Sequence, residues 1–155
     1  MAGSAVGTVA PEFELPKAGG GSLRLSDLRG RPVVLFFYPK DDTSACTAEA
    51  IDFSTLRPEF ERAGAIVLGI SPDSRKKHDK FKAKYELRVD LLSDEDKSTL
   101  QAYGVWGEKT LYGRKYMGVI RTTVLVGVDG RIARLWPQVR VADHAAEVLE
   151  AVRSL

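Results

Sequence analysis

Two apolar runs separated by one helical segment constrain the fold of this chain more than any other feature. Residues 33–38 (VVLFFY) and 65–71 (AIVLGIS) are rich in β-branched and aromatic side chains. Continuous apolar runs of this length are typical of strands that are buried on both faces of a sheet. Between them, residues 43–62 carry apolar side chains at roughly helical spacing, and Pro58 is expected to kink this helix or to begin a second one.

The segments that follow continue the alternation of strands and helices. We expect a helix from the Ser71-Pro72 pair to about Tyr85, a strand at 90–92, a helix that Ser93 caps and Gly104 stops, and a final amphipathic helix at 142–152. Caps and helix-stopping glycines set the expected ends of these elements.

Antiparallel hairpins are expected at both ends of this alternating region. Asp129-Gly130 is a favoured turn dipeptide and joins strands expected at 121–128 and 131–136. The Gly-rich residues 18–22 join two short N-terminal strands. The order predicts an α/β fold with a central mixed sheet flanked by helices on both faces. This plan is similar to the thioredoxin fold with an extra N-terminal β-hairpin, in a single domain of residues 1–155.

Charge and cysteine content exclude several classes of function. The chain has 23 Lys and Arg against 21 Asp and Glu, which is too balanced to indicate a nucleic-acid or membrane partner. One cysteine and two histidines cannot form an intrachain disulfide or a Cys₄ or Cys₂His₂ zinc site, and no metal is expected. A lone thiol suits a reducing compartment, and neither a secretory signal nor a membrane-spanning run is evident. We therefore expect a soluble cytoplasmic protein.

The single cysteine, Cys46, falls where the first buried strand passes into the following helix. Ligands of open α/β sheets bind at the carboxyl ends of the strands, where this junction lies. Unpaired N–H groups and the positive end of the helix dipole favour a thiolate in the first turn. A lone cysteine is otherwise commonly a small buried hydrophobic residue. From the residues alone, a nucleophilic role and a packing role both remain open.

Several separated motifs resemble one protein family. The pattern Pro39-x-x-x-Thr43-x-x-Cys46 is similar to the signature of the peroxiredoxins, which are thiol peroxidases with a thioredoxin fold. Residues 37–43 (FYPKDDT) resemble the bacterioferritin comigratory protein, or peroxiredoxin Q, branch. Further matches in the order of that branch occur at 69–71 (GIS), 91–94 (LLSD) and 104–109 (GVWGEK). The resemblance extends from about Gly7 to the C-terminus.

The resemblance implies roles for four residues. It implies that Cys46 is the peroxidatic cysteine, that Thr43 hydrogen-bonds the sulfur and the peroxide, and that Pro39 shields the thiolate. It also implies an arginine at the start of a later strand, and the string RTTVL places it at Arg121. A guanidinium supplies permanently charged donors for the thiolate and the departing oxygen. Arg114 is the nearest rival, although it lies in a segment expected at the surface.

Three other polar residues are expected to be less important. Glu49 matches a family position and could steady the arginine, but an acid in the first helical turn also favours the helix dipole. Both interpretations of Glu49 remain open. His78 and His144 match no family site and are expected on solvated helix surfaces.

The sequence departs from the branch at the resolving cysteine, which most members carry five residues after the peroxidatic one. Ile51 occupies that position, and the chain has no other cysteine. A sulfenic acid at Cys46 therefore cannot become an intramolecular disulfide. We expect regeneration by thioredoxin, glutaredoxin or a low-molecular-weight thiol, or passage through an intermolecular Cys46–Cys46 link.

These features predict a one-cysteine thiol peroxidase that reduces hydrogen peroxide and organic hydroperoxides without metal, haem, flavin or other cofactor. The alternative is a peroxide sensor or relay whose oxidised Cys46 forms mixed disulfides with a partner protein. A thioredoxin-type disulfide reductase is disfavoured because it needs Cys-x-x-Cys, and Thr43 occupies the first position. The branch tends toward monomers, so we expect a monomer, with a dimer as the alternative.

Overall fold

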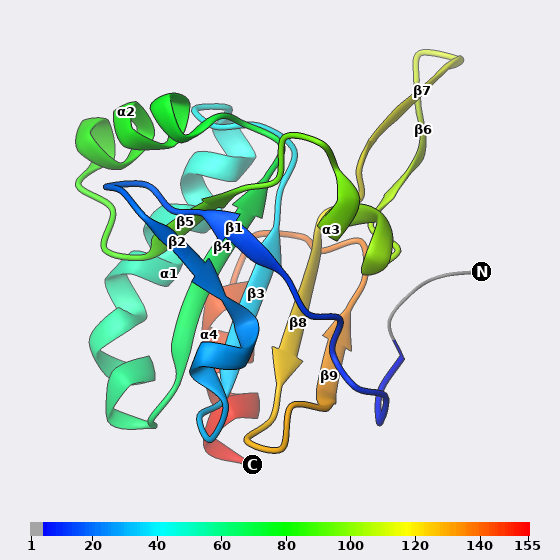
Figure 1. Ribbon diagram of the computed structural model, residues 1–155. Helices are drawn as coiled ribbons and strands as arrows, with labels where there is room; N and C mark the ends of the chain where they lie inside the picture. The colour runs from blue at the N-terminus through cyan, green and yellow to red at the C-terminus, as the bar shows by residue number, and fades with distance from the viewer. Residues whose placement is uncertain (1–4) are drawn as a thin grey trace.

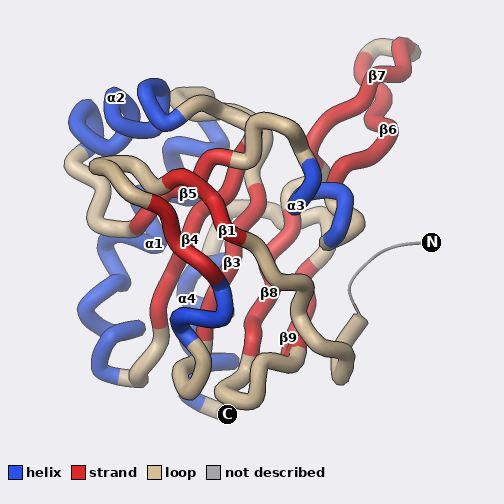
Figure 2. The backbone as a smooth tube through the Cα atoms, viewed as in Figure 1, coloured by secondary structure: helices blue, strands red, loops and turns tan. Residues whose placement is uncertain are grey.

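A five-stranded mixed sheet forms the centre of the computed structural model, which describes residues 5–155 (Figures 1 and 2). The strand order is β5-β4-β3-β8-β9, in which the first three strands are parallel and β8 and β9 are antiparallel to their neighbours. The strands are β3 (Val33–Phe37), β4 (Ile66–Ser71), β5 (Asp90–Ser93), β8 (Thr122–Val126) and β9 (Ile132–Trp136). The predicted mixed sheet is confirmed.

Helices cover both faces of this sheet because its central strand is apolar on both sides. Val34 and Phe36 of β3 pack on one face with α1 (Ser44–Arg62), α2 (Arg75–Tyr85) and α4 (His144–Arg153). Leu35 and Phe37 pack on the other face, as alternate residues of a strand must. The elements on that face are β1 (Glu14–Pro16), β2 (Ser22–Arg24), the 3₁₀ helix η1 (Leu25–Leu28) and α3 (Ser98–Ala102). The β1–β2 pair is the predicted N-terminal hairpin.

A third pair of strands projects from the upper end of the sheet and was not predicted. It consists of β6 (Trp106–Leu111) and β7 (Arg114–Val119), paired in an antiparallel hairpin (Figure 1). Tyr112 and Gly113 form the turn, and both have positive φ, as a tight hairpin turn requires. Its large apolar side chains Leu111, Tyr112, Tyr116 and Met117 are exposed. The sequence of these strands shows no regular alternation of apolar and polar residues, which is the usual signal of a half-buried strand.

The first residues of two helices differ from the prediction. Ser71 ends β4 and does not cap a helix; α2 begins four residues later, where the Ser74 hydroxyl accepts a hydrogen bond from the Lys77 backbone N–H at 3.2 Å. Ser93 likewise ends β5, and the short α3 begins only at Ser98. In both places the strand continues farther because its serine is buried and pairs within the sheet.

Pro58 does not begin a second helix, which was one of the two outcomes that the sequence predicted. The helix is continuous from Ser44 to Arg62 with the proline inside it. Phe53 and Phe60 lie on either side of Pro58 and are fully buried. Packing of both halves of the helix on the sheet therefore outweighs the one backbone hydrogen bond that the proline removes. None of the helices in the described part of the chain is long and apolar enough to cross a membrane.

Gly69, in the middle of β4, leaves room for the side chains of Phe36 on β3 and Leu91 on β5, the two neighbouring strands. A Cβ atom at this position would lie 2.6 Å from Phe36 Cζ and 2.8 Å from Leu91 Cδ2, and both of these side chains are fully buried. We predict that Gly69→Ala lowers the free energy of unfolding by about 1–3 kcal/mol, measured by urea denaturation. Gly118→Ala is the control, because its Cβ would meet movable side chains on the hairpin. Equal stabilities for the two variants would contradict this account.

Candidate active site

Cys46 lies in the first turn of α1. Thr43 is the N-cap residue, so the backbone N–H of Cys46 is among those without an acceptor in the preceding turn. The side chain is only 1% exposed and packs within the hydrophobic cluster beneath α1. A sulfur in this position gains support from the helix dipole while being shielded from water.

Arg121, in the link between β7 and β8, supplies the polar contact of the sulfur. Its Nη2 donates a hydrogen bond to Cys46 Sγ at 3.2 Å, and its Nη1 donates to Glu49 Oε1 at 2.6 Å. The Arg121 guanidinium thus contacts two residues of α1 that precede it in the sequence by 72 positions (Glu49) and 75 positions (Cys46). The rival, Arg114, is exposed beside the turn of the β6–β7 hairpin. The structure therefore brings Arg121 to the cysteine and leaves Arg114 at the surface.

Glu49 is a buried acid, and among the described residues its hydrogen-bond partner is this arginine. Its side chain is 1% exposed, and its second oxygen, Oε2, has no hydrogen-bond partner among the described residues. Burial raises the pKa of Glu49 to about 7, although the charge and hydrogen bond of Arg121 oppose the rise. The sequence left two roles open for Glu49, a contact with the arginine and a favourable interaction with the helix dipole. The structure shows the contact with Arg121.

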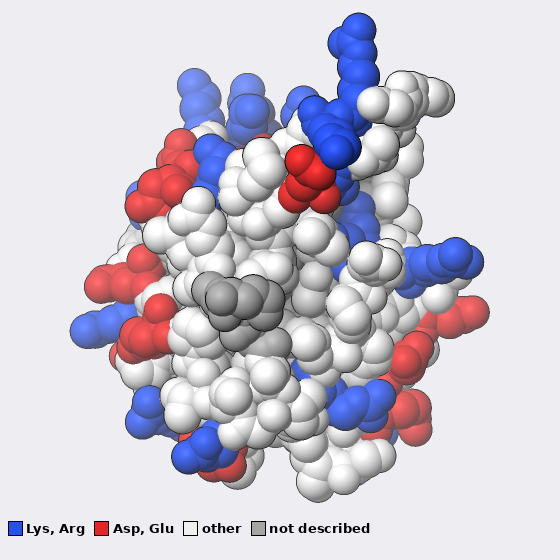
Figure 3. Space-filling model, turned by 90° about the vertical axis from the view of Figure 1, so that its right-hand side faces the viewer, with Lys and Arg blue, Asp and Glu red and all other residues white. Residues whose placement is uncertain are grey.

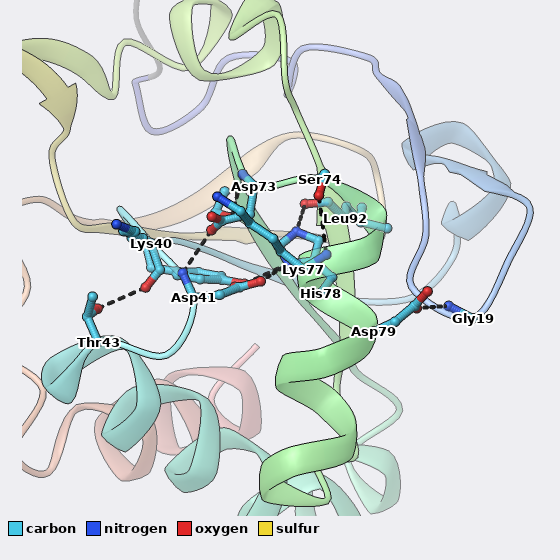
Figure 4. A network of polar contacts seen from close by, with 12 residues as sticks. Gly19, Lys40, Asp41, Thr43, Asp73, Ser74, Lys77, His78, Asp79 and Leu92 are labelled. Carbon is cyan, nitrogen blue, oxygen red and sulfur yellow. Dashed lines mark hydrogen bonds and ion pairs between the residues drawn. The ribbon is translucent and has the colours of Figure 1, made fainter.

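Thr43 and Pro39 lie in the loop that leads into α1. The Thr43 hydroxyl donates its proton to the Lys40 carbonyl at 2.8 Å, as Figure 4 shows, and not to the sulfur. Its oxygen remains able to accept a hydrogen bond from a ligand. Pro39 is half-buried directly after β3. Thr43 thus lies at the start of α1 with its hydroxyl turned toward the loop, and Pro39 lies earlier in that loop.

Lys109, on β6, is a second cation near the site that the motif reasoning did not single out. Burial and the nearby charge of Arg121 lower the pKa of Lys109, whereas Cys46 opposes this shift. Its Nζ donates to the Val119 carbonyl at 2.8 Å. In Figure 3, Lys and Arg side chains gather at the upper end of the molecule, where the hairpin projects. Lys109 is the last residue of the GVWGEK motif at 104–109, so this motif could have pointed to it.

Both histidines are buried, contrary to the prediction that they lie on solvated helix surfaces. His78 is fully buried on α2, and His144 is 5% exposed at the start of α4. The Nε2 atom of His144 lies 2.8 Å from Thr123 Oγ1, and burial lowers the pKa of His144. Each histidine has polar partners in the interior, which is why a helix can turn it inward.

The raised pKa of Glu49 predicts how stability depends on pH. Because the folded protein holds the Glu49 proton more tightly than the unfolded chain, wild-type stability should fall relative to Glu49→Gln as pH rises from about 4.5 to above 7. We expect a relative loss on the order of 2 kcal/mol, measured by urea denaturation at the two ends of this range. The protein with Glu49 and the Glu49→Gln variant should both carry Cys46→Ser, so that ionisation of the thiol does not contribute to the comparison. A constant difference in stability across this range would contradict the prediction.

Comparison with known proteins identifies the family. The AhpC/TSA family matches residues 6–135. Peroxiredoxin Bcp of Bacillus subtilis is 41% identical, with 97% of this chain and 96% of that protein covered. Peroxiredoxin Q of Xanthomonas campestris is 42% identical with a TM-score of 0.88, covering 92% of this chain and 90% of that one. A second structure, of Xanthomonas campestris bacterioferritin comigratory protein, is 38% identical with a TM-score of 0.90 and covers 97% and 98%.

These similarities agree with the motifs and with the geometry around the cysteine. The thioredoxin-like fold is confirmed by the two Xanthomonas structures. The family acts on a peroxide and draws on a thiol reductant. The chain belongs to the AhpC/TSA family and, within it, to the bacterioferritin comigratory protein or peroxiredoxin Q group of thiol-dependent peroxidases, from which it differs in lacking the usual resolving cysteine.

Proposed function

We propose that this peroxiredoxin works with one cysteine, which reduces hydrogen peroxide and organic hydroperoxides. The Cys46 thiolate attacks the terminal oxygen of the hydroperoxide, so that an S–O bond forms as the O–O bond breaks. The sulfur is oxidised by two electrons to a sulfenic acid. The departing oxygen takes up a proton and leaves as water or an alcohol. Arg121 donates to the thiolate and to the charge that develops on the oxygens.

The second half of the cycle uses thiols from outside the chain. One thiol attacks the sulfenic acid, releases water and leaves a mixed disulfide with Cys46. A second thiol then attacks this disulfide, restores the Cys46 thiol and leaves as an external disulfide. External thiols are required because the chain has one cysteine and Ile51 stands where the branch carries its resolving residue.

The contact between Arg121 Nη2 and Cys46 Sγ at 3.2 Å is the single observation that carries this proposal. A guanidinium is permanently charged, and at this distance it stabilises a thiolate more than a thiol. In the same scheme Thr43 binds the peroxide through its hydroxyl oxygen and Pro39 shields the sulfur from water. The Xanthomonas campestris protein described for its alkyl peroxide reduction activity supports organic hydroperoxides as substrates.

Peroxide consumption with a thiol reductant tests the proposed cycle. We predict multiple turnovers of hydrogen peroxide and cumene hydroperoxide with dithiothreitol or a thioredoxin system, and no turnover by Cys46→Ser. Turnover retained by Cys46→Ser would refute the proposal. Oxidation of one equivalent, followed only by stoichiometric capture of a partner protein, would instead favour the sensor or relay function.

Arg121 and Arg114 form a matched pair of variants for the peroxide step. We predict that Arg121→Ala slows oxidation of Cys46 by about 100-fold or more, which is the usual cost of losing a charged donor to the reacting oxygen. Arg114→Ala should change this rate less than about twofold because its side chain is exposed at the hairpin turn. Single-turnover oxidation with stoichiometric peroxide measures both. A similar rate for the two variants would remove Arg121 from the mechanism.

A further inference from the structure

A buried polar network lies under the loop that joins β3 to α1. The Tyr38 hydroxyl donates to Asp41 Oδ1 at 2.6 Å, and His78 Nδ1 lies 2.6 Å from Asp41 Oδ2. The other ring nitrogen of His78, Nε2, lies 2.9 Å from the Leu92 carbonyl. His78 is fully buried, and Asp41 is 8% exposed. The network thus ties the loop to α2 and β5 in the interior (Figure 4).

The hydrogen-bond partners define where the protons are. A backbone carbonyl only accepts, so Nε2 of His78 carries a proton toward Leu92. Nδ1 faces a carboxylate oxygen, and a second proton between these two atoms is needed for a favourable contact. Burial and the nearby Asp41 raise the pKa of Tyr38, which keeps its proton and donates it to the other oxygen. His78 and Asp41 are therefore joined by a charge-assisted hydrogen bond.

Asp41 is also held through its backbone. Its N–H donates to Asp73 Oδ2 at 2.8 Å, and the Ser71 hydroxyl donates to the same oxygen at 2.7 Å. Asp41, Asp73 and His78 have potential metal-ligating atoms within 4.8 Å of one another. The oxygens and the ring nitrogen that face each other already make internal hydrogen bonds, however, so the contacts describe an anchor for the loop.

The anchor bears on Cys46 because Asp41 lies two residues before Thr43, the N-cap of α1. Asp42, at a φ of 61°, adds a second tie outside, where it accepts hydrogen bonds from Lys84 Nζ and the Tyr85 hydroxyl of α2. The segment of chain from Asp41 to Cys46 is therefore short, and the hydrogen bonds of Asp41 hold its first residue in place. Opening of the first turn of α1 requires movement of this loop.

The two steps of the proposed cycle make opposite demands on that turn. The peroxide step needs Cys46 beside Arg121, which is the arrangement in the structure. An external thiol must approach the sulfur in line, yet Cys46 is only 1% exposed. The second step therefore needs more opening than the first.

We propose that His78 is a positioning residue, which holds the loop and the first turn of α1 closed through Asp41. It thereby speeds the peroxide step and slows attack by the external thiol. This inference rests on the proposed one-cysteine cycle. Because a merely structural residue would change both rates in the same direction when removed, opposite changes in the two rates are the signature of the proposal.

The test compares His78→Gln and Asp41→Asn with wild type in three rates. Stoichiometric peroxide gives the rate of Cys46 oxidation, dithiothreitol gives the rate at which the sulfenic acid is reduced, and a bulky maleimide gives the accessibility of the reduced thiol. For His78→Gln we expect oxidation to slow about tenfold, and reduction and alkylation to quicken about tenfold, as loss of a charge-assisted hydrogen bond implies. Asp41→Asn should change all three rates in the same directions but less, because its amide can still pair with Tyr38 and His78.

His144→Gln is the matched control, since it replaces a second buried histidine, which is hydrogen-bonded to Thr123 and, among the described residues, has no hydrogen bond to the loop. We expect it to lower thermal stability without the opposite changes in rate. Equal changes in His144→Gln, a parallel fall of all rates in His78→Gln, or no change would each overturn the proposal. If His78→Gln does not fold, Asp41→Asn decides by the same criteria.

Failure of the proposed function gives a separate result. If wild-type protein does not turn over peroxide with thiols, the one-cysteine cycle is wrong, but alkylation of Cys46 still measures whether His78 holds the turn closed.

Discussion

The guanidinium of Arg121 lies between two acidic groups, and the chemistry of the site depends on how it serves both. One of its nitrogens bonds the Cys46 sulfur and another bonds the Glu49 carboxylate. The carboxylate fixes the orientation of the guanidinium but competes for its charge. Burial raises the pKa of Glu49 to about 7, so this competition is weakened near neutral pH, where part of the carboxyl is protonated.

Burial of the cysteine protects the thiolate but restricts its later reaction. The sulfur packs in the core under α1, so water and large molecules are kept away from it. A chain with a resolving cysteine can convert the sulfenic acid to an intramolecular disulfide, whereas this chain has only Cys46. In the proposed one-cysteine cycle, an outside reductant must reach the buried sulfur, so the sulfur has to be uncovered at every turnover. The anchor formed by Asp41 and His78 is positioned to set how readily that happens.

The sequence predicted the fold wherever burial left a pattern, and it missed polar residues whose partners come from distant segments. The run at 33–38 indicated the central strand, and the string RTTVL indicated Arg121. His78 was assigned to the surface because lysines surround it, although Phe81 and Tyr85 follow it at the spacing of one helix face. The β6–β7 hairpin was missed because its apolar side chains are exposed and so leave no alternation.

Mass spectrometry of the intact protein after one equivalent of hydrogen peroxide tests the central claim most directly. The account predicts the addition of one oxygen atom, located at Cys46, which an external thiol removes without formation of a disulfide-linked dimer. An unmodified Cys46, or oxidation that appears only as a Cys46–Cys46 dimer, would contradict it.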